Sequence, residues 1–273
     1  MSEIHSFHIP PSIKINVIID DLHHQGQIKY LKQLGLERVD RIFSTYGYAF
    51  GKFYSMTKPV YFLPHAATFP INFNPCPTNR ILLSGRIIKD IYPFRNLIHK
   101  LSKKLKNSID YLNVNFNYRL KYDNPTFIYG ERYIQRLNSY LACFTCDASE
   151  HRPYIVAKHF EILASGSLLL AANIHTKIYL EHLGLIDGIH YISVNMTNIE
   201  EKIQYVLDPA NRSTIDSIRF AGYEMANKFH FFPNRAEFLA KILDNNVEMQ
   251  IQVQTDGLNG STYLMEMEKT NPL

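Results

Sequence analysis

The sequence lacks any long apolar run and has few cysteines. No stretch of the 273 residues approaches the roughly 18 apolar residues that a membrane span requires. The N-terminus has no basic segment followed by an apolar one, so we expect no signal peptide and no transmembrane segment. The three cysteines, Cys76, Cys143 and Cys146, are too few for a disulfide framework. These absences predict a cytoplasmic protein in a reducing compartment.

A strong charge of either sign is also missing. The formal net charge is only +4, from 29 basic and 25 acidic residues. This mild excess suits a protein that handles anionic phosphates, and we expect no nucleic-acid partner. The basic run 100–106 has helical spacing with apolar residues on one face, which favours a solvated helix face over a nucleic-acid patch.

Neither a metal site nor a redox motif is predicted. Cys143 and Cys146 have C-x-x-C spacing, but they lie in an apolar stretch, without a second such pair or a Cys/His pair downstream. Buried cysteines are therefore favoured over zinc or redox chemistry. His23 and His24 also lack the spacing of a metal site. We expect no bound metal and no tightly bound cofactor.

Strand-like and helix-like segments alternate along most of the chain, and 46% of its residues are hydrophobic. Short apolar segments rich in β-branched residues predict strands, and amphipathic segments predict helices. We expect strands at 13–19, 41–44, 60–63, 81–83, 111–114, 140–146, 168–172 and 191–194. We expect helices at 28–34, 48–56, 94–105, 129–138, 154–164, 199–207, 215–229 and 235–243. This alternation predicts an α/β fold with parallel sheets covered by helices.

A connector rich in proline and asparagine, at 69–79, divides these segments into two groups. We therefore predict two lobes, each with its own parallel sheet. The first is a partial N-terminal lobe at 1–72. The second is a domain at 73–245, and residues 246–273 are predicted to form a tail.

The clearest arrangement of candidate site residues lies in the segment 140–172. A buried strand is followed by a polar loop and a helix, which we expect to begin near Pro153 and to end at Gly166. In open parallel sheets, ligands bind beyond the carboxyl ends of the strands and near helix N-termini, which attract phosphate. Lys158 and Glu161 share one face of this helix. They form either a phosphate and ribose clamp or an ordinary surface ion pair, and spacing leaves both open.

Several motifs along the chain resemble one enzyme family. The segment 158–171, KHFEILASGSLLLA, resembles the donor-binding signature of group 1 GT-B glycosyltransferases, and is closest to the branch of CgeB-like spore-coat proteins. Four further segments agree with the family's pattern and follow in the same order, at 60–67 (VYFLPHAA), 84–95 (SGRIIKDIYPFR), 191–207 and 221–235. The similarity covers roughly residues 60–243.

The resemblance implies a GT-B fold with two Rossmann-like lobes, here with a shortened N-terminal lobe. It implies a metal-independent transferase that moves a sugar from a nucleoside-diphosphate sugar to a glycan, protein or small-molecule acceptor. Glu161 matches the glutamate that binds the nucleotide ribose, and Lys158 lies where a basic residue faces the donor phosphates. Cations there stabilise the charge that grows on the leaving diphosphate. The resemblance also assigns donor binding to the loop and helix that carry Gly85, Arg86, Lys89 and Arg95.

One departure from the family's pattern concerns the donor sugar. Pro153 stands where many retaining relatives carry a second glutamate, and Glu150 is the nearest substitute. We expect the donor sugar to meet this loop and its surroundings, at Glu150, Tyr154 and Gly166. The stereochemical outcome stays open.

Three residues are candidates for catalysis, namely Asp20, Asp21 and His65. The aspartates follow a predicted strand, where they act as a base or contact acceptor hydroxyls; the alternative is a helix-capping aspartate. His65 either contacts the donor sugar or is structural. Because the N-terminal lobe is short, two rivals to a transferase remain. One is an inactive nucleotide-sugar-binding or scaffold protein, and the other is a sugar-phosphate enzyme of the same shape, such as an epimerase.

Overall fold

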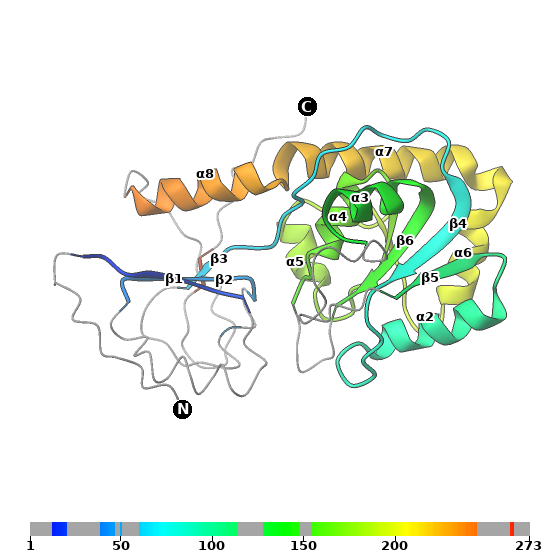
Figure 1. Cartoon of the computed structure of the whole chain (residues 1–273), viewed down its shortest axis with the longest axis horizontal. Coiled ribbons are helices and arrows are strands. Elements are labelled where there is room, and N and C mark those ends of the chain that lie inside the picture. Colours follow the sequence, from blue (N-terminus) through cyan, green and yellow to red (C-terminus); the bar gives the residue numbers. More distant parts are fainter. Residues whose placement is uncertain are drawn as a thin grey trace. The chain divides into compact units, whose positions relative to one another are not determined.

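The computed structural model describes residues 13–20, 39–46, 50, 60–113, 128–147, 154–244 and 263–264. The chain forms two compact units (Figure 1). Unit 1 comprises Met1–Leu63 and Met249–Glu266, and unit 2 comprises Pro64–Glu248 and Met267–Leu273. The domain limits expected at residues 72 and 245 stay predictions. Among the described residues, no helix combines the length and apolar character that crossing a membrane requires.

Unit 1 contains a parallel four-stranded sheet in the order β1-β2-β3-β9. Its strands are β1 (Asn16–Ile19), β2 (Arg41–Ser44), β3 (Val60–Phe62) and β9 (Tyr263–Leu264). The side chains of Ile42 and Phe43 are fully buried and supply its core. The sequence predicts the first three strands, but not β9, which is too short to show a periodic pattern. The helices expected at 28–34 and 48–56 lie outside the described residues.

Unit 2 contains a parallel five-stranded sheet in the order β5-β4-β6-β7-β8. Every residue of β6 and β7 is buried, as expected for central strands with helices on both faces. All five strands overlap predicted ones, and most limits differ by a few residues. The strands are β4 (Thr78–Ser84), β5 (Ile109–Leu112), β6 (Tyr140–Cys146), β7 (Leu168–Ala172) and β8 (Ile192–Ser193).

Helices cover both faces of this sheet. On one face, apolar side chains of α2 (Pro93–Lys104) and α6 (Ile199–Leu207) join those of the strands in one core cluster. On the other, α3 (Gly130–Asn138), α4 (Lys158–Ala164) and α7 (Arg212–Phe229) pack together (Figure 1). The remaining elements are α5 (Lys177–His182), the short 3-10 helix η3 (Pro209–Asn211) and α8 (Phe232–Leu243). Of these, α5 and η3 are not predicted from the sequence.

The start of α4 differs from the expectation that this helix begins near Pro153. The helix begins at Lys158, after the non-helical stretch 154–156. The carbonyl of Val156 accepts hydrogen bonds from both the amide and the Nδ1 of His159, each at 3.0 Å. This local turn sets the helix start, and the β-branched Ile155 and Val156 favour extended backbone before it.

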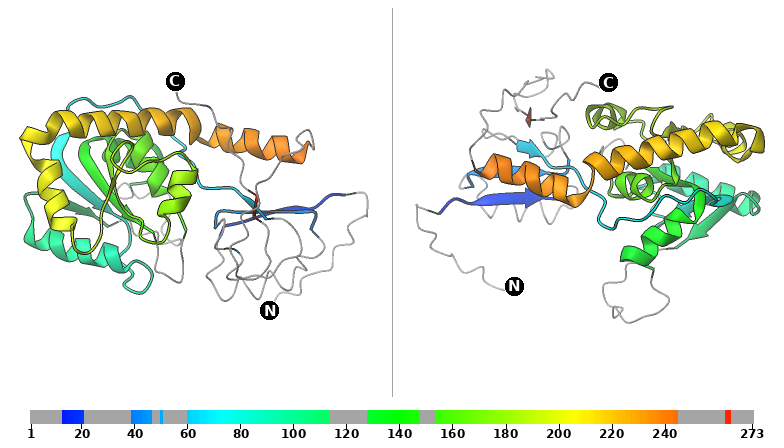
Figure 2. Two further views of the ribbon diagram at one scale, coloured as in Figure 1. Left: turned by 180° about the vertical axis from the view of Figure 1, so that it is seen from behind. Right: turned by 90° about the horizontal axis from the view of Figure 1, so that it is seen from above.

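The connector expected at 69–79 is fixed along α7 before it enters β4 (Figure 2). The Tyr223 hydroxyl donates to the Ile71 carbonyl at 2.9 Å, and Phe73 packs edge-on against Phe220. These contacts tie the connector to unit 2.

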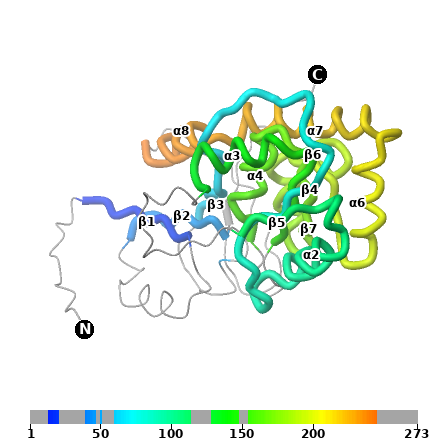
Figure 3. Tube along the Cα trace, turned by 45° about the vertical axis from the view of Figure 1, so that its right-hand side comes forward, coloured from blue at the N-terminus to red at the C-terminus, as the bar shows by residue number. Residues whose placement is uncertain are grey.

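The strand order creates a switch point between β4 and β6. The chain passes from β4 outward to β5, and then returns to β6 on the other side of β4 (Figure 3). In parallel sheets, ligands bind outside the carboxyl ends of the strands at such a point. Because β4 ends at Ser84 and β6 at Cys146, the residues that follow them lie where a ligand is expected.

Candidate functional site

Gly85 makes a turn at the carboxyl end of β4 that only glycine adopts without strain. Its φ is +108°, and a Cβ placed on it would collide with Nζ of Lys158 and lie 3.4 Å from Nη1 of Arg95. The buried backbone of Gly85 therefore lies between two cationic side chains, one from α4 and one from α2.

Lys158 reaches back from the start of α4 to the end of β4. Its ammonium donates a 2.7 Å hydrogen bond to the carbonyl of Ser84. Among the described residues it forms no ion pair, so the surface pair with Glu161, expected as the alternative, is not formed. Burial, together with the nearby Arg95 guanidinium, holds the pKa of Lys158 well below its ordinary value. A cation in this state gains from an anionic ligand.

Arg95 is the second cation, and its side chain is almost entirely buried, with 4% exposed. Its Nη1 donates to the carbonyl of Arg86 at 3.1 Å, and its guanidinium lies 3.9 Å from the centre of the Tyr92 ring. Its Nε has no hydrogen-bond partner, and no carboxylate pairs with it in the described part of the chain. A buried guanidinium without an anion is unfavourable on its own, and an anionic ligand would relieve this cost.

The predicted basic residues thus separate into two groups. Arg95 and Lys158 meet beside Gly85, whereas the side chains of Arg86 and Lys89 are exposed. Arg86 contributes its backbone carbonyl, which orients Arg95. The sequence does not distinguish among these four basic residues, because it does not show which side chains are buried.

Glu161 lies one turn further along α4, half-buried. Burial raises the pKa of its carboxyl, and the positive charge of Lys158 opposes this shift. No described residue donates a hydrogen bond to the carboxylate. Nearby, the Tyr133 hydroxyl is 2.7 Å from Oγ of Ser84, and the charge of Glu161 contributes to the raised pKa of Tyr133. Glu161 therefore offers unused acceptor oxygens near Lys158.

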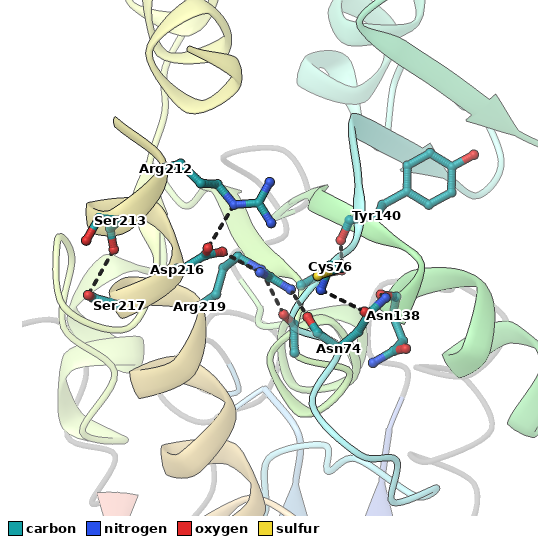
Figure 4. Close-up of polar contacts among 11 residues, drawn as sticks. Asn74, Cys76, Asn138, Tyr140, Arg212, Ser213, Asp216, Ser217 and Arg219 are labelled. Carbon is teal, nitrogen blue, oxygen red and sulfur yellow. Dashed lines mark hydrogen bonds and ion pairs between the residues drawn. The ribbon is translucent and has the colours of Figure 1, made fainter. Parts of the chain in front are cut away.

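Gly166 does not lie with these residues. It closes α4 just before β7 begins, so it lies at the amino end of the sheet, opposite the carboxyl ends. Its φ is +78°, and a Cβ there would lie 2.9 Å from the Phe73 ring. The buried Arg219 donates to the carbonyls of Gly166 and Asn74 and pairs with Asp216 (Figure 4). Gly166 thus has a structural role in the turn between α4 and β7.

Tyr154 is buried and lies four residues before Lys158, and its hydroxyl is 3.1 Å from that of Tyr92. Glu150, the other residue expected near the donor sugar, lies outside the described residues, as does Asp21. Neither Tyr92 nor Tyr133 is predicted from the sequence as a site residue. Tyr92 lies in the 84–95 motif, which could have pointed to it, whereas Tyr133 lies in no motif.

The remaining catalytic candidates are engaged in contacts of their own units. In unit 1, the hydroxyl of Thr45 lies 3.1 Å from both the carbonyl and the carboxylate of Asp20, so Asp20 ties the ends of β1 and β2 together. In unit 2, the carbonyls of Pro64 and His65 accept hydrogen bonds from Arg235.

No group of histidine, cysteine, aspartate and glutamate side chains in the described ranges is arranged to hold a metal ion. Burial raises the pKa of the Cys143 thiol to about 12 and that of Cys146 to about 11. The expectation that both cysteines are buried is confirmed.

Asp147, directly after β6, was not predicted as a site residue. One oxygen accepts from the amide of His175 at 2.8 Å and from the hydroxyl of Thr176 at 3.4 Å, just before α5. Burial raises the pKa of this carboxyl to about 7. Between its ordinary pKa and pH 7 the folded protein therefore holds a proton that the unfolded chain has released, and stability falls as pH rises through this window.

Asp147→Asn is expected to stabilise the protein at pH 8 and to have little effect at pH 4. The amide keeps an acceptor for both donors and removes the buried charge, so a gain of about 1–2 kcal/mol is expected at pH 8. Urea unfolding at both pH values measures it. Asp208→Asn is the matched control, because Asp208 accepts from the Ala210 amide in η3 while exposed. An equal effect of Asp147→Asn at both pH values would contradict the prediction.

No protein-family model matches the chain, and no curated protein matches it. Solved structures do match. HepE from Anabaena, in complex with UDP-glucose, is 9% identical with a TM-score of 0.59, over 85% of this chain and 72% of that chain. Sucrose-phosphate synthase from Thermosynechococcus elongatus is 12% identical with a TM-score of 0.54, over 85% and 67%. The GtfA/B complex is 13% identical with a TM-score of 0.51, over 85% and 52%.

At these identities the likeness concerns the fold. The predicted α/β fold class, with two Rossmann-like parallel-sheet lobes as in GT-B glycosyltransferases, is confirmed. The chain spans about half the length of the matched GtfA/B chain, at 52%.

Proposed function

We propose that this chain binds a nucleoside-diphosphate sugar and transfers its sugar to a glycan, protein or small-molecule acceptor. The observation that carries the proposal is the pair of cations at the switch point, Arg95 and Lys158, which have no carboxylate partner in the described residues. A diphosphate would supply the missing negative charge through charge-assisted hydrogen bonds. The fold is similar to that of HepE, which was crystallised with UDP-glucose, so UDP is the first ligand to test.

The residues divide the work of donor binding. Arg95 and Lys158 face the diphosphate, and their charge stabilises the negative charge that grows on it as the glycosidic bond breaks. This role needs no metal ion, and we propose a metal-independent reaction. Glu161 accepts hydrogen bonds from ribose hydroxyls, as its unused acceptor oxygens suggest.

The finer assignments rest on the sequence motifs. We place the chain in the CgeB-like branch on the segment 158–166, and we propose a cytoplasmic location. Glu150 and Tyr154 are proposed to lie near the donor sugar, with Gly85, Arg86 and Lys89 on the phosphate side. On the acceptor side the proposed residues are Asp20, Asp21 and His65.

A second candidate function is binding of a nucleotide sugar without transfer. One observation favours it: the carboxylate of Asp20, a candidate base, already lies 3.1 Å from the Thr45 hydroxyl. Both candidates use the same donor site.

Two measurements separate the candidates. Calorimetry with UDP, ADP and GDP tests binding, and release of nucleoside diphosphate from nucleotide sugars, with and without acceptor extracts, tests transfer. A transferase binds and turns over. Binding without turnover across the donor and acceptor panel would favour the second candidate, and absence of all nucleotide binding would contradict both.

The role of Glu161 gives a separate prediction. Glu161→Ala is expected to weaken UDP binding by about 1.5–3 kcal/mol, the range for hydrogen bonds to a charged group. The loss should nearly vanish when 2′,3′-dideoxy-UDP replaces UDP, because that ligand has no ribose hydroxyls. Glu131→Ala, on the exposed face of the adjacent helix α3, is the control. An equal loss for both ligands in a folded variant would rule out the ribose contact.

A further inference from the structure

Arg95 is held in place by an aromatic ring and a carbonyl. Its Nη1 bonds to the Arg86 carbonyl at 3.1 Å, and its guanidinium lies 3.9 Å from the centre of the Tyr92 ring. In the described residues no carboxylate orients it from another side. The direction of the unpartnered Nε therefore depends on where the Tyr92 ring lies.

Tyr92 is itself held at both ends. Its amide donates to the Ile88 carbonyl at 2.8 Å, just before α2 begins at Pro93. Its hydroxyl lies 3.1 Å from the hydroxyl of Tyr154. The Tyr154 side chain is anchored in the interior, since only 8% of that residue is exposed. The ring under Arg95 is thus tied to a point outside its own loop.

This hydroxyl pair joins the two segments that carry the cations. Tyr92 lies three residues before Arg95, and Tyr154 lies four residues before Lys158. Apart from this pair, the cations are connected to each other through the turn at Gly85, where Lys158 bonds to Ser84 and Arg95 to Arg86. These two connections, both among the described residues, hold the spacing and the direction of the cations.

We propose that Tyr92 and Tyr154 are positioning residues, whose paired hydroxyls hold the ring under Arg95 so that Arg95 and Lys158 face one diphosphate. The inference rests on the proposed function, because the ligand is the diphosphate of the donor. Neither hydroxyl needs to touch the ligand. The pair acts by ordering Arg95 before the ligand arrives, which reduces the entropy lost on binding.

The test uses phenylalanine substitutions in the full chain, because phenylalanine keeps the ring and removes only the hydroxyl. Tyr92→Phe and Tyr154→Phe are each expected to lower UDP affinity, measured by calorimetry, about two- to tenfold. The double variant should bind UDP no more weakly than either single variant, because both remove the same bond. Affinity for uridine, which has no phosphate, should stay unchanged in an NMR titration.

Tyr140→Phe is the matched control. Its hydroxyl also donates to one partner, Asp110 at 2.9 Å, but it lies at the amino end of β6, away from the site. This variant should bind UDP as the wild type does. If the hydroxyls served folding alone, Tyr92→Phe, Tyr154→Phe and Tyr140→Phe would all lower the thermal stability. Any loss of affinity would then be the same for UDP and for uridine.

Three outcomes would overturn the inference while leaving the proposed function intact, provided that the wild type binds UDP. They are wild-type UDP affinity in both single variants, losses that add in the double variant, and equal losses for UDP and uridine. If the wild-type chain bound none of UDP, ADP and GDP, the proposed function would be contradicted. The inference about the hydroxyl pair would then fail too, because it depends on a bound diphosphate.

Discussion

Replacing Lys158 by methionine is expected to cost the free protein no stability and to remove most of its affinity for UDP. The ammonium is buried beside Arg95, which lowers its pKa, so the charged form is disfavoured in the folded protein. Methionine has a similar volume and no charge to desolvate, which offsets the lost bond to Ser84. In this variant a bound diphosphate loses one of the two cations beside Gly85, so affinity should fall about 100-fold, near 2.7 kcal/mol.

The pH dependence of stability follows from the lowered pKa of Lys158. A lysine whose folded pKa is lowered loses its charge more readily in the folded protein, so the penalty of burying it is largest at low pH and declines as pH rises. The stability of Lys158→Met relative to wild type should therefore be higher at pH 6 than at pH 9, as measured by thermal unfolding.

Lys100→Met is the control for charge alone. Lys100 lies on the exposed face of α2, where solvent and salt screen its interactions. Its loss should leave UDP binding nearly unchanged. If Lys158→Met retained wild-type affinity, the phosphate role of Lys158 would be wrong. If it lost binding and unfolded at the same time, Lys158 would be a structural residue.

Gly85→Ala is expected to lower both stability and UDP affinity. A φ of +108° is a conformation that residues with a Cβ rarely adopt, and the strain should cost about 1–3 kcal/mol of stability. The added methyl also collides with Nζ of Lys158, which must leave the Ser84 carbonyl. Arg95 can stay, because its Nη1 lies at a contact distance of 3.4 Å from the added methyl. Displacement of Lys158 alone removes one of the two cations, so UDP affinity should fall about 10- to 100-fold.

Gly188→Ala separates these two effects. Gly188 also has a positive φ, +79°, but a Cβ there meets no atom within 4 Å. This variant should lose stability through backbone strain and keep its UDP affinity. Equal affinity losses in both variants, measured by calorimetry under conditions where each is folded, would show that strain rather than contact with the cations explains the effect.

Much of the fold is predictable from local pattern. The apolar strands predicted at 140–146 and 168–172 are confirmed with the same limits, because strands buried on both faces are continuous apolar runs in the sequence. The start of α4 is not predictable in this way. Pro153 is a good first residue for a helix. The helix nevertheless begins at Lys158, because His159 and Val156 form a local turn there.

The site is less visible in the sequence, because it depends on contacts between distant residues. Spacing places Lys158 and Glu161 on one helix face, but does not show that Lys158 turns away to a carbonyl 74 residues earlier. Arg86 and Arg95 are equivalent in the motif, and only burial distinguishes them. Gly166 lies within the signature, yet the length of α4 places it at the opposite edge of the sheet from Lys158.

The most direct test is a crystal structure of the chain with UDP bound. We expect the diphosphate within hydrogen-bond distance of the Arg95 guanidinium and the Lys158 ammonium, beside Gly85, with the ribose hydroxyls on the Glu161 carboxylate. UDP bound elsewhere, or bound with Arg95 and Lys158 still without an anionic partner, would contradict the account.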